Sequence, residues 1–486
     1  MTLKNERTQS GLSGPVLALL YLFLALGPVL LVVLFGGGMR SGHSIAPLLG
    51  RAFGGVALSM MLLQFVTSGR FEMISGRIGL DHTMAFHRLA AVSVLLLIIL
   101  HVLGFAMRQP DQMPVEILMR FAGYILNSRF LTGSLAALFL MVIVGVGKYC
   151  RRDFPYPVWR ISHGVLAVLA VVLAIGHGVS HARLFAGGAG MAMFAVLVVL
   201  AAGSVVVVYI WRPVMAFRHG FRVERVRQLS PTIADLTLIA PTGTRFDFAA
   251  GQFCWITRNG HHTVTDNPFS MASISSDLPR LRFLIRNAGD MSGSVAGLTP
   301  GTLMGVDGPH GNFTLNASQD GPVLLLAGGI GVAPILGLLR ALATSGDRRP
   351  VRVLVAAKTA EDHVVRDEIL AFAQQLDLQV IFLVEQDAGA SSGFEAGMCK
   401  GAHIARLIGD DDPAQVTACV CGPSAMMDHV TGLLLRAGVL ADHIITERFD
   451  FDAATDPVSR KAKWRFVGIL TVIFMATALI VVAGAG

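Results

Sequence analysis

Four histidines lie inside long apolar stretches of the first half of the chain, in two pairs with the same spacing. His87 and His101 bound the segment HRLAAVSVLLLIILH, and His163 and His177 bound HGVLAVLAVVLAIGH. Fourteen residues of α-helix turn through about 1400° and rise about 21 Å, so the histidines of a pair share one helix face. Polar side chains inside a membrane span are costly and commonly functional. The spacing predicts two sites at two depths of a helical bundle.

The spacing also limits what these sites could hold. One metal ion could not bind four histidines spread over about 21 Å, because metal–nitrogen bonds are about 2 Å long. Two b-type haems fit, stacked across a hydrocarbon core of about 30 Å. The alternative is that the buried histidines only form hydrogen bonds between helices. If both helices run outward, His87 pairs with His163 on the inner side and His101 with His177 on the outer side.

Two other histidines bear on this assignment. His181 follows His163 by eighteen residues, five full turns, and therefore lies on the same helix face. It could replace His177 as a ligand or donate protons near the outer haem, although the matched spacing favours His177. His82 lies about 140° away from the face of His87, and we expect it in a loop.

Composition indicates a membrane protein with a soluble part. Of the 486 residues, 53% are hydrophobic and 15% charged, and the apolar residues concentrate near the two ends of the chain. Spans are expected at residues 15–35, 47–67, 84–106, 131–147, 157–179, 190–211 and 466–482. Lys and Arg flanking the spans favour a cytoplasmic N-terminus, in a multi-pass protein of the plasma or inner membrane. The same residues account for the net charge of +7, so no nucleic-acid partner is expected.

The soluble part changes character along its length. Short alternating strands punctuated by Gly, Pro and Asp predict an antiparallel β-barrel, and apolar strands alternating with helices then predict a doubly wound α/β domain. Five cysteines, an odd number, argue against a disulfide framework and for a reducing compartment. The expected organisation is a cytoplasmic tail (1–14), a six-helix haem-binding domain (15–215), the barrel (220–318), the α/β domain (321–455) and a seventh transmembrane helix (464–484).

The segment DNPFSMAS follows a strand that contains GQF, and FLIRNAGDMS lies downstream. NPFS alone would be an ordinary turn. In this order, however, the chain resembles the NADPH oxidase/ferric reductase superfamily, whose members join a six-helix haem domain to a ferredoxin-reductase-like flavoprotein. The resemblance covers about residues 50–450 and implies FAD in the barrel. It implies that Phe269 packs on the isoalloxazine ring and that Ser270 donates a hydrogen bond near flavin N5.

The same resemblance assigns the flavin phosphates. Asn267, before Pro268, occupies the place of a basic residue in the family, and a neutral amide cannot pair with a pyrophosphate. Arg286 is expected to supply that charge, and Gly289 to Ser292 match the family's G-x-x-S phosphate turn.

A glycine-rich turn, GGIGVAP, follows an apolar strand and precedes a helix, after the GPHGNF segment that matches the family's domain boundary. Glycines let the backbone approach a pyrophosphate, whose charge the helix N-terminus favours. Proline suits the first helical turn, because its missing N–H costs nothing there. The predicted nucleotide-binding residues are Gly328, Gly329, Gly331 and Pro334.

The resemblance implies further residues at the nicotinamide. Cys421, Gly422 and Pro423 match the family's segment beside the hydride-donating ring, although a cysteine at a strand end is otherwise often a simple buried residue. Glu447 matches a family acid nearby, and Phe449 or Phe451 matches the aromatic that covers the flavin. Lys358 could hold a 2′-phosphate and favours NADPH, whereas the neighbouring Glu361 and Asp362 favour NADH.

The expected activity is that of a transmembrane NAD(P)H-dependent flavohaem reductase or oxidase in the lipid bilayer. Its acceptor on the outer side is either oxygen, giving superoxide, or a ferric chelate, since the superfamily contains both. Arg51 and His181 could attract an anion there, although Arg51 equally suits an interfacial anchor. Two alternatives are a donor module that reduces a membrane or periplasmic partner protein, and a haem-free regulator or transporter that uses the reductase fold for binding.

Overall fold

The computed structural model describes residues 11–35, 45–68, 71–107, 112–181, 188–218, 220–258, 264–315, 320–385, 393–448 and 457–485. The chain divides into two compact units. The helical unit comprises residues 11–78, 82–208 and 462–486, and the sheet unit consists mainly of residues 209–461.

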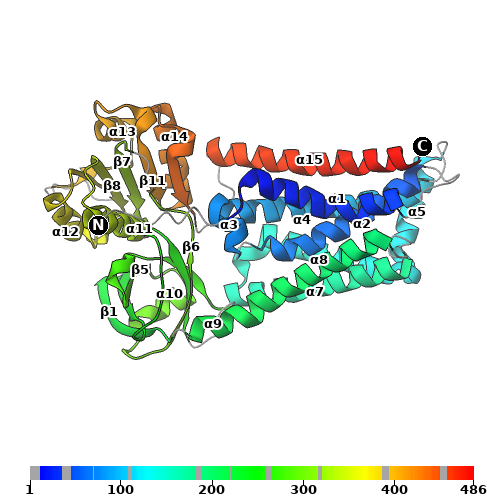
Figure 1. The fold of residues 1–486 in the computed structure, drawn as a ribbon, viewed down its shortest axis with the longest axis horizontal. Coiled ribbons are helices and arrows are strands. Elements are labelled where there is room, and N and C mark those ends of the chain that lie inside the picture. Colours follow the sequence, from blue (N-terminus) through cyan, green and yellow to red (C-terminus); the bar gives the residue numbers. More distant parts are fainter. Residues whose placement is uncertain are drawn as a thin grey trace. The chain divides into compact units, whose positions relative to one another are not determined.

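Among the described residues, seven helices are long and apolar enough to cross a membrane, and each overlaps one of the expected spans, of which only residue 67 lies beyond its helix (Figure 1). They extend over Gly14–Phe35 (α1), Ile45–Val66 (α2), Leu80–Ala106 (α4), Ser128–Cys150 (including α6, Leu131–Gly145), Tyr156–His181 (α7), Gly188–Arg218 (beginning with α8, Gly188–Val206, and ending with α9, Arg212–Arg218) and Arg460–Gly484 (within α15, Pro457–Ala485). Two further helices, α3 (Glu72–Ile78) and α5 (Pro114–Leu126), lie between spans.

One expectation about α4 is wrong. His82 lies in the first turn of this helix and not in a loop. The helix begins at Leu80, directly after Gly79, whose φ of +90° suits a turn. Asp81 in the first turn complements the positive end of the helix dipole.

The seventh apolar helix, α15, is an integral part of the bundle. Leu470 and Ile473 are buried in the same hydrophobic core as residues of α1, α2 and α4. The Phe466 ring lies 5.3 Å from that of Phe86 in α4, and Phe474 lies 6.5 Å from Phe53 in α2. The opposite side of α15 carries exposed apolar residues, which suits contact with lipid chains.

The first part of the sheet unit contains two three-stranded antiparallel sheets. One has the order β1-β2-β5, and the other has the order β4-β3-β6. The strands are β1 (Arg222–Ser230), β2 (Ile233–Ile239), β3 (Phe253–Arg258), β4 (Asn267–Ser270), β5 (Arg280–Arg286) and β6 (Met304–His310). Isolated bridges, Arg222 to Leu303 and Met271 to Phe283, connect them. Both sheets bury apolar residues in one shared core, as a barrel would require, and closure of the barrel stays a prediction.

The second part is a parallel sheet with the order β10-β9-β8-β7-β11-β12. Its strands are β7 (Val323–Gly328), β8 (Val351–Ala357), β9 (Leu378–Val384), β10 (Glu395–Ala396), β11 (Thr417–Cys421) and β12 (Ile444–Glu447). Leu325 packs with α11 (Val332–Ser345) on one face, and Leu324 packs with α13 (Gly401–Ile408) and α14 (Ser424–Arg436) on the other. The expected doubly wound arrangement is therefore present. The strand order reverses between β7 and β11, and open α/β sheets bind ligands at such a switch point.

Candidate functional site

The helical unit brings the four histidines of the apolar spans together as two pairs. His87 of α4 faces His163 of α7, with ring centroids 6.5 Å apart. His101 of α4 faces His177 of α7, with ring centroids 6.2 Å apart. These are the pairs that the matched spacing predicts, and they form because α4 and α7 each present both histidines on one face.

Both distances fit two imidazoles bound to opposite sides of one metal ion. A ring nitrogen lies about 1.1 Å from its ring centroid and about 2 Å from a bound metal, so two such centroids are about 6.2 Å apart. The Nδ1 atoms of His87, His163 and His177 are buried and make no hydrogen bond within the described ranges. Hydrogen bonding between helices through Nδ1 therefore does not explain why these three rings are buried. The geometry therefore fits axial ligation of two haems.

His101 has the orientation expected of a metal ligand. Its Nδ1 lies 2.8 Å from the backbone oxygen of Gly50 in α2. A carbonyl only accepts hydrogen bonds, so Nδ1 carries the proton and Nε2 keeps its lone pair for a metal. Ligating histidines commonly donate their other N–H to a carbonyl, which fixes the tautomer and the ring orientation.

Two glycines make room for the rings of this second pair. A Cβ atom on Gly54 of α2 would lie 2.4 Å from His101 Nδ1, and a Cβ on Gly133 of α6 would lie 2.8 Å from His177 Nδ1. Either distance is shorter than ordinary contact. The backbones of two further helices therefore pack directly against the histidine rings.

His181 lies beside this pair and does not face His101. Its ring stacks on that of His177 with centroids 5.0 Å apart, and its Nδ1 lies 3.2 Å from His177 O. Aromatic residues that the sequence did not single out extend the cluster: Phe130 lies 5.2 Å from His181, and Phe105 lies 5.3 Å from His101. Phe105 lies one helical turn after His101 in α4, whereas Phe130 comes from a separate segment, so no local pattern could have identified Phe130.

The first pair has neighbours of a different kind. The Trp159 ring lies 5.3 Å from the His163 ring, one helical turn earlier in α7. Gln64 of α2 donates from Nε2 to the backbone oxygen of His87 at 3.1 Å. The amide thus holds the α4 backbone beside the histidine without using either ring nitrogen.

The predicted flavin residues lie on β4, which pairs with β3. Ser270 is opposite Phe253 and is buried, whereas Phe269, opposite Cys254, is half-buried at the edge of the core. Pro268 precedes it on the same strand. Asn267 donates from its amide to Thr265 O at 3.2 Å, which is a local hydrogen bond within the chain. NPFS is therefore a strand and not an isolated turn.

One predicted phosphate residue, Arg286, lies against the glycine-rich turn. A Cβ on Gly329 would lie 3.5 Å from Nη1 of Arg286, so the guanidinium lies against this turn. Ser292 Oγ accepts from the backbone N–H of Ala288 at 2.9 Å and donates to Gly289 O at 3.1 Å. The hydroxyl therefore closes the turn that begins at Gly289.

Glycines at the ends of β7 and β11 allow two loops to meet at the switch point. A Cβ on Gly331 would lie 2.2 Å from the backbone oxygen of Cys421, and one on Gly422 would lie 3.0 Å from Gly328 Cα. Gly329 has a φ of +54°, a conformation that favours glycine. Pro334 lies buried in the first turn of α11, and Pro423 directly precedes α14. The two predicted motifs thus form one surface.

Cys421 and Glu447 are register partners on β11 and β12. The Cys421 thiol donates to Glu447 O at 3.8 Å. Burial raises the pKa of the Cys421 thiol and raises that of the Glu447 carboxyl well above its ordinary value. Glu447 is 3% exposed, and its Oε2 makes no hydrogen bond within the described part of the chain. The structure therefore places a buried thiol and a buried carboxyl group side by side at the switch point.

The remaining predicted residues are Lys358 and the two candidates for the aromatic that covers the flavin. Lys358 is exposed directly after β8, the neighbour of β7 in the sheet. Phe449 and Phe451, the candidates for the aromatic that covers the flavin, lie outside the described residues.

Comparison with known proteins identifies both units. The ferric reductase like transmembrane component family matches residues 53–174, and the oxidoreductase NAD-binding domain family matches residues 325–432. The reductase component of propane 2-monooxygenase from Gordonia sp. (strain TY-5) is 28% identical over 233 residues, which cover 47% of this chain and 66% of the relative. The chain thus spans less than two thirds of that relative.

Ferredoxin–NADP reductase B from Sorangium cellulosum (strain So ce56) is 30% identical over 237 residues, which cover 47% of this chain and 96% of that protein. Among solved structures, flavohemoglobin from Malassezia yamatoensis with bound FAD and heme aligns with a TM-score of 0.47 at 18% identity, over 91% of this chain and 100% of that one. The chain therefore belongs to the NADPH oxidase/ferric reductase superfamily, with a ferric-reductase-like transmembrane domain fused to a ferredoxin-reductase-like module.

Proposed function

We propose that this protein passes electrons from cytoplasmic NADPH, by way of FAD and two b-type haems, to oxygen or a ferric chelate on the outer side of the membrane. The observation that carries the proposal is the pair of histidine contacts between α4 and α7, at 6.5 and 6.2 Å. When bound, FAD supplies the exchange between a two-electron hydride and single electrons, and the haems supply one-electron transfer.

The residues of the helical unit would hold the haems and shield them. His87 and His163 would ligate the inner haem, and His101 and His177 the outer one. With both axial positions taken at each iron, an acceptor would be reduced at the edge of the site and not at the metal. The apolar helices around the rings exclude water, and the Gly50 carbonyl keeps His101 in the ligating tautomer.

The residues of the sheet unit would hold the flavin and the nucleotide, with residues 220–318 as the FAD domain and 321–455 as the nucleotide domain. Phe269 and Ser270, beside Pro268, would position the isoalloxazine ring. The flavin phosphates would bind near Asn267, Arg286, Gly289 and Ser292, and the nucleotide phosphates would bind at the glycine-rich turn formed by Gly328, Gly329, Gly331 and Pro334. The charge of Arg286 beside Gly329 supports this assignment, because Asn267 carries none.

The switch point would receive the nicotinamide. Cys421, Gly422 and Pro423 lie at the carboxyl end of β11, where a planar ring could approach the backbone. Burial raises the pKa of Glu447, which favours a carboxyl that would hold a proton in this water-poor place. Lys358, exposed after β8, would pair with a 2′-phosphate and so favour NADPH over NADH. The basic residues flanking the spans favour a cytoplasmic sheet unit.

A visible spectrum of the purified protein tests the proposal. We expect two low-spin haems b per FAD, both reduced by NADPH. The variant His163→Ala should lose the inner haem and all reduction of outer-side acceptors, while NADPH-dependent reduction of a soluble dye by the flavin continues. A His163→Ala variant with the full haem content and full transmembrane activity would contradict the ligand assignment.

The acceptor is identified by a second experiment on the wild-type protein in sealed vesicles. Superoxide trapping reports oxygen reduction, and ferrozine reports ferrous iron formed from a ferric chelate. Reduction of neither, with both haems reduced by NADPH, would contradict a small acceptor and point to a partner protein.

A further inference from the structure

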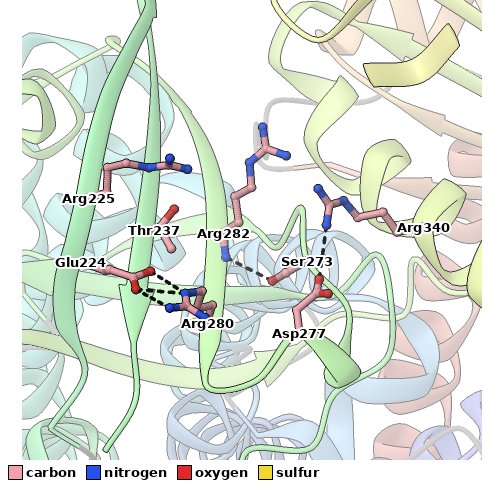
Figure 2. Close-up of a pocket in the computed structure, with 8 residues that line it drawn as sticks. All are labelled: Glu224, Arg225, Thr237, Ser273, Asp277, Arg280, Arg282 and Arg340. Carbon is pink, nitrogen blue, oxygen red and sulfur yellow. Dashed lines mark hydrogen bonds and ion pairs between the residues drawn. The ribbon is translucent and has the colours of Figure 1, made fainter. Parts of the chain in front are cut away.

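The sheet unit contains a cavity of about 730 Å³ that none of the predicted site residues lines. It lies between the outer surface of the β1-β2-β5 sheet, the segment that follows β4, and helix α11 (Figure 2). Its lining residues are Glu224, Arg225, Thr237, Ser273, Asp277, Arg280, Arg282 and Arg340. Four of the eight are arginines and two are acidic, and Asp235 and Glu368 behind the lining also pair with Arg282 and Arg340.

Strand register brings two of the arginines to one row of the sheet. Arg225 on β1 is opposite Thr237 on β2, which is in turn opposite Arg282 on β5. Arg340 approaches from α11 on the other side of the cavity. Figure 2 shows the guanidinium groups of Arg225, Arg282 and Arg340 directed toward the same open space.

Acidic partners neutralise some of these charges and hold the arginine side chains in place. Arg280 donates from Nε to both oxygens of Glu224 at 2.9 Å. Arg282 and Arg340 both bind Glu368 of helix α12 (Arg366–Ala371), at 2.8 and 2.7 Å. This shared carboxylate keeps the two guanidinium groups close together on opposite walls of the cavity.

One charged side chain of the cavity keeps unused capacity. Arg225 forms no ion pair with any residue of the described chain and is exposed, so its guanidinium can donate to a ligand in the cavity.

We propose that this cavity binds a phosphorylated small molecule that carries at least two negative charges. Guanidinium groups bind phosphate through paired, charge-assisted hydrogen bonds. Three of them, converging from different directions, suit a tetrahedral oxyanion with several acceptor oxygens better than a planar carboxylate with two. The volume also lies within the range of about 300–1,000 Å³ that is usual for small-molecule sites. The ligand would bridge the flavin-binding and nucleotide-binding parts of the sheet unit. Its binding would be a property additional to the proposed electron transfer.

Titration of inorganic pyrophosphate into the detergent-solubilised, FAD-loaded full-length protein tests this site. Saturating NADP⁺ is present throughout, so that the nucleotide site is occupied. We expect saturable binding in the calorimeter and an increase in the melting temperature of the sheet unit, followed by flavin fluorescence. Absence of saturable heat, or binding that appears only when NADP⁺ is omitted, would overturn the proposal.

The variant Arg225→Ala should bind pyrophosphate about tenfold more weakly or worse, since it loses a charge-assisted hydrogen bond. Arg222→Ala is the matched control: Arg222 is on the same strand and exposed, and it donates to Gly301 O outside the cavity. It removes the same charge, so its affinity should stay near that of the wild type. Equal affinities of Arg225→Ala and the wild type would refute the site, and citrate binding as tightly as pyrophosphate would refute the phosphate assignment. An unchanged FAD content shows that Arg225→Ala is folded.

Discussion

The packing of Gly54 against His101 predicts a large effect from adding one methyl group. In Gly54→Ala, the new Cβ would lie 2.4 Å from His101 Nδ1 and 2.8 Å from its Cε1, whereas ordinary contact begins at 3.4 Å. The histidine ring must therefore move by about 1 Å, since helix α2 carries Gly54 at a fixed place in the core.

That movement exceeds what a metal ligand tolerates. Metal–ligand distances vary by about 0.2 Å, so a shift of about 1 Å breaks or severely stretches a bond from His101 to iron. The hydrogen bond from Nδ1 to Gly50 O, 2.8 Å long, would also be disturbed. Loss of such an outer contact alone weakens metal binding about 10–100-fold. We expect Gly54→Ala to retain the inner haem and lose the outer one.

The assay is the ratio of haem to FAD in the purified protein, with reduced-minus-oxidised spectra of both. The ratio should fall from about two to about one, and reduction of the outer-side acceptor should stop. Gly145→Ala is the matched control, because Gly145 lies in α6 and its Cβ would meet no atom within 4 Å. Two low-spin haems per FAD in Gly54→Ala would refute both the assignment of His101 as a ligand and the inference that a methyl group at position 54 displaces its ring.

Three further predictions follow from single side chains. His177→Ala should lose the outer haem, whereas His181→Ala should keep two haems per FAD, and the opposite result would assign His181 as the ligand. Glu447→Gln should raise the melting temperature at neutral pH. Burial raises the pKa of Glu447 in the folded state, so the stability of the wild type falls as pH rises from about 4.3 toward that raised pKa. Glutamine does not titrate, so the variant should not show this fall. Glu368→Gln should cost about 1–3 kcal/mol of unfolding free energy at pH 7, measured in urea. Burial raises the pKa of Glu368, but the pairing with Arg340 and Arg282 lowers that pKa by more, so the net pKa lies below its ordinary value. The loss of stability should therefore vanish as pH falls below this lowered pKa, and a loss that persists there would contradict the ion-pair explanation.

Elements with a regular pattern could be predicted from the sequence. The apolar spans lie within the seven long helices, because about 20 consecutive apolar residues are needed to cross a bilayer and few other folds use them. The strand, turn and helix around Gly328 to Pro334 also have the expected order. Each of these features depends on residues close together in the chain.

Features that join distant segments could not be predicted. Arg225, Arg282 and Arg340 meet because of strand register and the position of α11, and no spacing in the sequence records this. The contacts of Gly54 and Gly133 with histidine rings likewise join helices that are far apart in the chain. The expectation of a loop at His82 is also wrong, because it considers only the helix face of His82. Gly79 and Asp81 mark the start of the helix before His82.

The sequence by itself determined that this protein has paired histidines on two apolar helices and glycine turns at the ends of parallel strands, because helical and strand periods are local properties. The tertiary structure alone decided how far apart the facing rings lie, which histidine of α7 faces His101, and which charged side chains enclose the arginine-lined cavity. Those outcomes depend on packing between elements, where a single methyl group or a shift of one residue in register changes which atoms meet.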